Sequence, residues 1–194
     1  MMKTILMTLM ALVFSTLAEP CLARDEDEKK VKKMSDSQKE RMHRRNKREA
    51  QEAWARDVKK RSRAEMQEME KDYQEINAKY KDPEIMEILE RFLKKYKKGN
   101  RVGCATMYLA QKSGGKDREK LLKKAIDDFS DAYYLDGCNV GGLARLYLAS
   151  HYKRAGDDRE AEKLIEEIEE DYDDAQDHSG KPIIEMAQAL REAE

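Results

Sequence analysis

The chain has 194 residues, 41% of them charged, and its formal net charge is only −1. Proline is rare, with three residues, and aromatic side chains make up 7%, whereas the helix-favouring residues Glu, Lys, Arg, Ala, Met and Leu are abundant. This composition predicts an all-α protein and argues against folds built on strands. The small net charge hides an asymmetry, because residues 39–63 are basic and residues 157–194 are acidic.

The first 23 residues have the features of a secretory signal peptide. Lys3 supplies a short positive segment, and residues 5–17 form an apolar run that is too short to span a membrane. Small residues allow cleavage after Ala18 or after Ala23. We therefore expect an exported protein, either periplasmic or secreted.

Cys21 lies at this junction and raises the alternative of lipoprotein anchoring. Glu19 and Pro20 stand directly before it and depart from the small-residue pattern of bacterial lipoproteins. The pattern therefore favours a soluble product over a lipoprotein or a retained membrane anchor.

Residues 24–36 are charged and lack periodicity, so we expect a disordered leader there. A capping-box pattern begins at Ser37, and neither proline nor glycine interrupts the stretch that follows. Residues 37–82 are therefore predicted to form one long charged helix, whose upstream half is exposed or disordered. Its downstream part, 66–80, carries a heptad-like apolar row that supports a weak coiled-coil homo-oligomer. The row consists of Met66, Met69, Tyr73, Ile76 and Tyr80.

The upstream part of this helix is strongly basic. Its cations are suited to an anionic lipid, a polyanion or nucleic acid, and the alternative is a solvated helix face. The stretch contains one aromatic residue, Trp54, and no nucleic-acid-binding motif, and export argues against a genomic target. Contact of this basic helix with a membrane surface is the alternative that remains compatible with export. The basic patch consists of Arg44, Arg45, Lys47, Arg48, Lys59, Lys60, Arg61 and Arg63.

Residues 83–194 contain a duplicated pattern. An amphipathic helix is predicted from Pro83 to Lys97. After it, the motif Ala-x-(Met/Leu)-Tyr-Leu-Ala begins at Ala105 and again 39 residues later at Ala144, and a glycine-containing turn and Asp-Arg-Glu follow each copy. The duplication predicts two helical hairpins and a closing helix. The hairpins are expected at 101–137 (helices 101–112 and 117–135) and 140–173 (helices 140–155 and 157–172), and the closing helix at 182–192.

The second copy resembles the tetratricopeptide repeat. The residues at that family's characteristic positions are Leu148, Ala149, Tyr152, Gly156, Ala161, Ile165 and Ile168. In the first copy, Ala125, Phe129 and Ala132 reproduce the spacing of the family's second helix. Arg145 stands where the family has Trp, and Gly137 and Asp173 stand where it has Pro.

This resemblance implies a right-handed superhelix, in which the first helices of the hairpins line a concave groove for peptides or partner helices. The groove residues that it implies are Arg101, Gln111, Lys112, Arg145, His151 and Lys153. The order of signal peptide, charged helix and repeats is similar to that of exported tetratricopeptide proteins of the bacterial envelope.

The remaining reactive residue types give no catalytic pattern. Cys104 and Cys138 are placed either to form a disulfide between the repeats or to fill the core. The histidines show no metal-ligand spacing, and the sequence lacks a Cys-x-x-Cys motif, a phosphate-binding loop and a nucleophile elbow. We therefore predict neither a metal, a cofactor nor a catalytic residue.

These observations predict a non-enzymatic, exported scaffold that binds a protein or peptide partner in the groove of its helical repeats. The alternative is a protein that binds an anionic surface through the basic helix 39–63.

Overall fold

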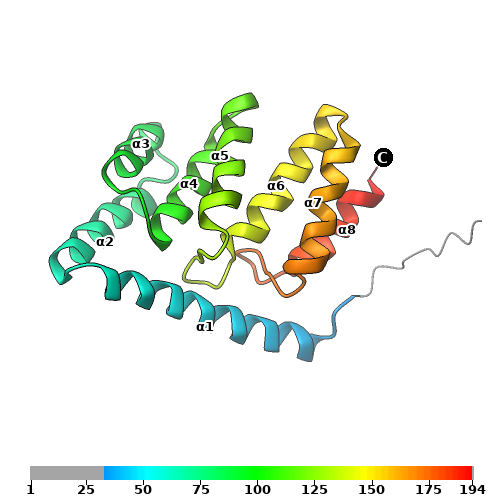
Figure 1. Cartoon of the computed structure of the whole chain (residues 1–194), viewed down its shortest axis with the longest axis horizontal. Helices are drawn as coiled ribbons and strands as arrows, with labels where there is room; N and C mark the ends of the chain where they lie inside the picture. Colours follow the sequence, from blue (N-terminus) through cyan, green and yellow to red (C-terminus); the bar gives the residue numbers. More distant parts are fainter. Residues whose placement is uncertain (1–32, 194) are drawn as a thin grey trace, which may run out of the picture. The chain divides into compact units, whose positions relative to one another are not determined.

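The computed structural model describes residues 33–193, and in this range the chain forms eight helices (Figure 1). In chain order they are α1 (Asp36–Lys60), α2 (Arg63–Ala78), α3 (Ile85–Lys95), α4 (Asn100–Lys112), α5 (Gly115–Phe129), α6 (Val140–Ala155), α7 (Asp158–Asp171) and α8 (Ile183–Glu192). The predicted all-α class is confirmed. The predicted signal peptide, residues 1–23, and the leader up to residue 32 lie outside the described residues.

Helices α2 to α8 form a row in which each helix packs against the next one along the chain (Figure 1). Alternate helices α2, α4, α6 and α8 also contact one another, so the row is built from helical hairpins placed side by side. Its core is apolar and includes Leu89, Met107, Leu122 and Ile165, which are completely buried. No helix within residues 33–193 combines the length and the apolar character that a membrane crossing requires.

Two loops of the row share one hydrogen-bond pattern. In the α5–α6 loop, Tyr134 N donates to Cys138 O at 2.9 Å, and in the α7–α8 loop Asp177 N donates to Lys181 O at 2.9 Å. Both residues of the second pair lie 43 positions after those of the first (134 to 177, 138 to 181), whereas the sequence motif recurs after 39. The four extra positions lie in α6, which ends 11 residues after Ala144, whereas α4 ends seven residues after Ala105. Helix α5 ends at Phe129, not near residue 135 as predicted.

The predicted single helix over 37–82 is wrong, because the chain breaks at Arg61 and Ser62. Ser62 caps α2: its hydroxyl accepts from Glu65 N at 3.2 Å, and the Glu65 carboxylate accepts from Ser62 N at 2.8 Å. This capping box satisfies backbone donors at a new helix start and so stabilises the break. The box at the start of α1 is formed by Ser35 and Gln38, two residues earlier than predicted.

The apolar row of α2 faces the protein's own core. Met69, Tyr73 and Ile76 are buried, and the ring of Tyr73 lies 5.9 Å from that of Phe92 in α3. The face that was expected to support a coiled coil is therefore occupied by helices of the same chain.

Helix α1 runs along one edge of the row, beneath the α5–α6 and α7–α8 loops (Figure 1). It is a docked helix, which corrects the expectation of an exposed or disordered segment. Its buried side is a narrow stripe in which, apart from one methionine, the residues are small or polar: Met42, Asn46, Ala50, Ala53 and Asp57. Contact is close, since a Cβ atom on Gly137 of the α5–α6 loop would come within 3.1 Å of the α1 backbone at Asn46 and Lys47.

Candidate functional site

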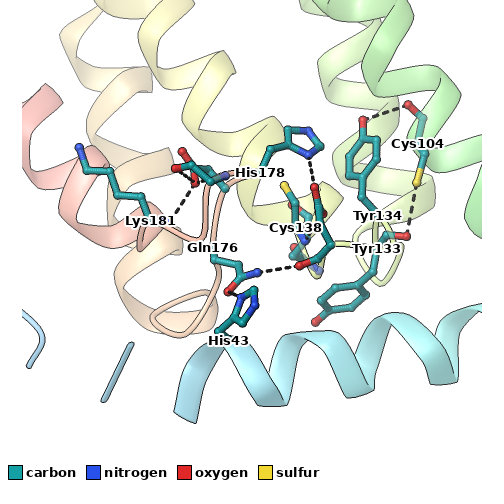
Figure 2. A network of polar contacts seen from close by, with 12 residues as sticks. His43, Cys104, Tyr133, Tyr134, Cys138, Gln176, His178 and Lys181 are labelled. Carbon is teal, nitrogen blue, oxygen red and sulfur yellow. Dashed lines mark hydrogen bonds and ion pairs between the residues drawn. The ribbon is translucent and has the colours of Figure 1, made fainter. Parts of the chain in front are cut away.

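A chain of polar contacts joins α1 to both loops (Figure 2). His43 Nδ1 of α1 lies 3.0 Å from the side-chain oxygen of Gln176, whose amide nitrogen donates to the Asp136 carbonyl at 3.0 Å. The Asp136 carboxylate lies 2.8 Å from His178 Nδ1 and accepts from Cys138 N at 3.0 Å. Although partial burial disfavours its charged form, the hydrogen bond to His178 holds the pKa of Asp136 below its usual value.

Further hydrogen bonds fix α1 along its length. The Asn46 side chain donates to the Asp174 carbonyl at 2.6 Å, and the Asp57 carboxylate accepts from Asn100 N at 2.7 Å. Near the start of α1, Glu185 of α8 accepts from Met34 N at 3.1 Å and also pairs with Lys39. The α1 edge is therefore a set of polar groups that satisfy one another, which is what a structural joint requires.

Cys104 and Cys138 are buried in this region and are not bonded to each other, so the structure does not form the disulfide considered above. Cys104 Sγ lies 3.5 Å from the Tyr133 carbonyl oxygen, and Cys138 lies in the α5–α6 loop (Figure 2). Burial raises the pKa of the Cys104 thiol to about 12 and also raises that of Cys138. Both thiols remain protonated at neutral pH, which suits a packing role.

A second group of residues gathers tyrosines from several helices. Tyr108 of α4 and Tyr147 of α6 occupy the same position in the duplicated motif, and Tyr80 follows α2. The rings of Tyr80 and Tyr108 lie 4.9 Å apart, and burial together with the neighbouring Tyr147 raises the pKa of Tyr80. All three side chains are half-buried, so each keeps part of its ring at the surface.

Polar and cationic groups border these tyrosines. The Tyr80 hydroxyl donates to the side chain of Gln111 at 2.8 Å, and the Lys112 ammonium lies 4.1 Å from the centre of the Tyr80 ring. The Arg118 guanidinium lies 5.6 Å from the centre of the Tyr147 ring. We call this set the tyrosine surface: Tyr80, Tyr108, Gln111, Lys112, Arg118 and Tyr147.

Two of the predicted groove residues, Gln111 and Lys112, therefore lie together at the tyrosine surface. Two others, Arg101 and Arg145, are instead engaged in contacts within the protein. Arg101 is 3% exposed and makes two hydrogen bonds to the Glu70 carboxylate, at 2.6 and 2.9 Å. Arg145 binds Glu167 of α7 at 2.7 Å, and its guanidinium lies 4.5 Å from the centre of the ring of Tyr172. Both guanidinium groups are occupied inside the protein and are not available to orient a peptide.

The last two predicted groove residues follow Tyr147 along α6, and His151 lies one helical turn after it. Lys153 pairs with Asp158 across the α6–α7 turn at 3.1 Å. His151 is half-buried and its ring lies 5.9 Å from that of Tyr152. The duplicated motif contains Tyr108 and Tyr147 but gave them no binding role, whereas Tyr80 and Arg118 carried no signal for this site.

Much of the predicted basic patch is neutralised. Arg45 pairs with Asp174 at 2.6 Å and Arg61 pairs with Asp57 at 3.3 Å, while Arg44 and Arg48 pair with acids on α1 itself. Within the described part of the chain, the patch residues that form no ion pair are Lys47, Lys59, Lys60 and Arg63. Three of these lie at the α1–α2 turn.

Residues 33–193 contain no group of His, Cys, Asp and Glu side chains that could hold a metal ion. Comparisons of the chain with protein-family models, with curated proteins and with solved structures gave no match.

Proposed function

We propose that this protein is a non-enzymatic interaction module, which binds a segment of a partner protein over the tyrosine surface. The observation that carries this proposal is the convergence of Tyr80, Tyr108 and Tyr147 from three separate parts of the helix row. Half-buried tyrosines present a large rigid area and a polar hydroxyl, and such residues are enriched where protein interfaces concentrate their binding energy.

The chemistry of the surface defines the partner segment. Lys112 and Arg118 place two positive charges beside the tyrosine rings. A matching segment carries one or two apolar or aromatic anchors flanked by acidic residues, because complementary charge favours association and fixes register. The Gln111 side chain, whose oxygen already accepts from Tyr80, offers its amide group as a further donor.

The proposal includes two finer elements that come from the sequence. The hairpin row and the residues of the second copy support a tetratricopeptide-like repeat, and the first 23 residues support export to the periplasm or the cell exterior. Binding of an anionic surface along the whole basic helix has less support, since Arg45 and Arg61 are paired within the protein.

Peptide-library display on the purified protein tests the proposal. Selected peptides should share apolar anchors with flanking acidic residues, and Lys112→Glu should weaken their binding about tenfold through like-charge repulsion. Tyr147→Ala should weaken it by a similar factor, with circular dichroism confirming that the fold persists. The control Lys94→Glu, on exposed α3 surface, should bind like wild type.

The two variants test whether the peptides bind at the tyrosine surface. If the selected peptides bind Lys112→Glu and Tyr147→Ala with unchanged affinity, the binding site lies elsewhere on the protein. Failure to enrich any peptide under low-salt conditions would also contradict the proposal.

A further inference from the structure

A cavity of about 310 Å³ opens between the C-terminal half of α1, the α3–α4 loop and the end of α5. The α1 side is a single helix face, which includes Arg56, Asp57 and Lys60, and the loop side includes Lys97 and Lys98. The other lining residues are Ala53, Gly99, Asn100, Asp128, Phe129, Asp131 and Ala132. Its cations therefore come from segments nearly 40 positions apart in the sequence.

The carboxylates of this cavity already have cationic partners. Asp57 pairs with Arg61 at 3.3 Å and Asp128 pairs with Lys124 at 3.2 Å, and neither partner lines the cavity. Asp131 pairs with Arg56 at 3.6 Å. Each acid that lines the cavity therefore has a cationic partner other than Lys60, Lys97 and Lys98.

Three lysines remain without a counter-ion among the described residues. Lys60 and Lys98 form no ion pair there, and the Lys97 ammonium donates only to the Leu93 carbonyl, at 3.0 Å. Like charges that line one small space repel each other, and that repulsion is relieved when an anion enters. The cavity thus carries a surplus of positive charge that the protein itself does not offset.

The lysines are held at the cavity by the way the loop docks. Asp57 accepts from Asn100 N at 2.7 Å, and the Arg61 guanidinium donates to the Lys98 carbonyl. Gly99 has φ +115°, and a Cβ atom there would lie 2.7 Å from the Asp57 carboxylate, so the loop approaches α1 only because this residue is glycine. The loop is pinned to α1, and Lys97 and Lys98 stay beside Lys60 in the absence of ligand.

We propose that this cavity binds a phosphate-bearing anion, held by the ammonium groups of Lys60, Lys97 and Lys98. Phosphate oxygens are strong acceptors, and lysine is a common phosphate ligand in proteins. The first amide of α4 takes no part, because Asp57 already occupies it. The site is separate from the tyrosine surface and stands independently of partner binding there.

Titration calorimetry with inorganic pyrophosphate tests the site. Wild type should bind one pyrophosphate per chain, and affinity should fall about tenfold for each lysine removed, as in Lys60→Gln with Lys98→Gln. The matched control, Lys59→Gln with Lys94→Gln, removes the same charge from exposed positions outside the cavity and should bind like wild type. Thermal melts with and without ligand check that both double variants fold.

A second arm identifies the source of the phosphate. Vesicles of phosphatidylglycerol in phosphatidylcholine are sedimented with wild type and both double variants. If the natural ligand is a lipid headgroup, vesicle binding is lost only in Lys60→Gln/Lys98→Gln and pyrophosphate competes with it. If the ligand is a soluble phosphate compound, pyrophosphate binds and the vesicles do not.

Two results overturn the proposal. One is the absence of both pyrophosphate and vesicle binding at low ionic strength. The other is an equal loss of binding in the two double variants, because it would show that diffuse surface charge, and not this cavity, attracts the anion.

Discussion

Helices α1 and α2 are neighbours in the sequence, and both are rich in charge, yet they attach to the protein in opposite ways. Helix α2 buries Met66, Met69, Tyr73 and Ile76, and burial of such side chains contributes about 1.5–3 kcal/mol each. Helix α1 is longer but buries mainly small and polar groups, and its hydrogen bonds contribute about 0.5–1.5 kcal/mol each. We therefore expect that detaching α1 costs less free energy than unfolding the row of helices α2 to α8.

The largest expected effect lies in the row itself. A Cβ atom on Gly141 of α6 would come within 2.6 Å of the Ser130 carbonyl oxygen and 2.9 Å of the Tyr172 hydroxyl. Gly141→Ala should therefore lower the free energy of unfolding by about 2–3 kcal/mol, through overpacking at a backbone contact. Urea denaturation measures this change.

Gly114→Ala is the matched control, because a Cβ atom there meets nothing within 4 Å. Its effect should stay within about 0.5 kcal/mol. Equal effects of the two substitutions would mean that the α5, α6 and α7 helices do not pack as closely as described.

A smaller, local effect is expected at α1. Asp57→Ala leaves Asn100 N without its acceptor and removes the carboxylate partner of Arg61, and the loss of a buried acceptor typically costs about 1–3 kcal/mol. Hydrogen exchange should accelerate in α1 by the corresponding factor, while the amides of α6 keep their protection. Glu52→Ala, at an exposed position on the same helix, is the control and should leave exchange unchanged.

If hydrogen exchange accelerated equally in α1 and α6 of Asp57→Ala, α1 would not detach at a lower free-energy cost than the row. Such a result would show that the edge helix and the row unfold as one cooperative unit.

The smallest effect is expected under acid. Burial disfavours the charged form of Glu185, but its hydrogen bonds to Lys39 and Met34 N outweigh this and hold its pKa below the usual 4.5. The stabilisation from this group is complete above pH 4.5 and is lost as the pH falls through the folded-state pKa. The Met34 amide resonance should follow this titration, and Glu185→Gln should abolish it. A midpoint at or above 4.5 would contradict the contact.

The sequence was most informative where both ends of a helix are marked by residues typical of helix starts and stops. The limits predicted for α6, residues 140–155, agree with the structure, because Asn139 caps its start and Gly156, with φ +77°, ends it. The α1–α2 break was also encoded, in Ser62 and Glu65, but strong helix propensity on both sides concealed it. Capping residues therefore predicted a helix boundary correctly where the helix propensity of the flanking residues did not point to a continuous helix.

The docked side of α1 could not be predicted from hydrophobic periodicity. Asn46 and Asp57 are polar, and Ala50 and Ala53 are small, so their pattern resembles a solvated face until the loops that receive them are placed. The candidate site was predicted in part. Gln111 and Lys112 converge at Tyr80, but the partner of Arg101 is Glu70, which lies 31 positions away in the sequence, and no local pattern connects the two.

The position of α1 also has a mechanical consequence. In a row of helical hairpins each hairpin contacts only its neighbours, so the shape of the row is set by small rotations at successive interfaces. At 25 residues α1 is roughly 37 Å long, and it is fastened to the start of α4 through Asp57, to the α7–α8 loop through Asn46 and to α8 through Lys39. Bending the row at this edge requires either deforming a continuous helix or breaking one of these attachments. We therefore expect the protein to be stiffer along the α1 edge than along the opposite edge, and we expect tension to open the opposite edge first.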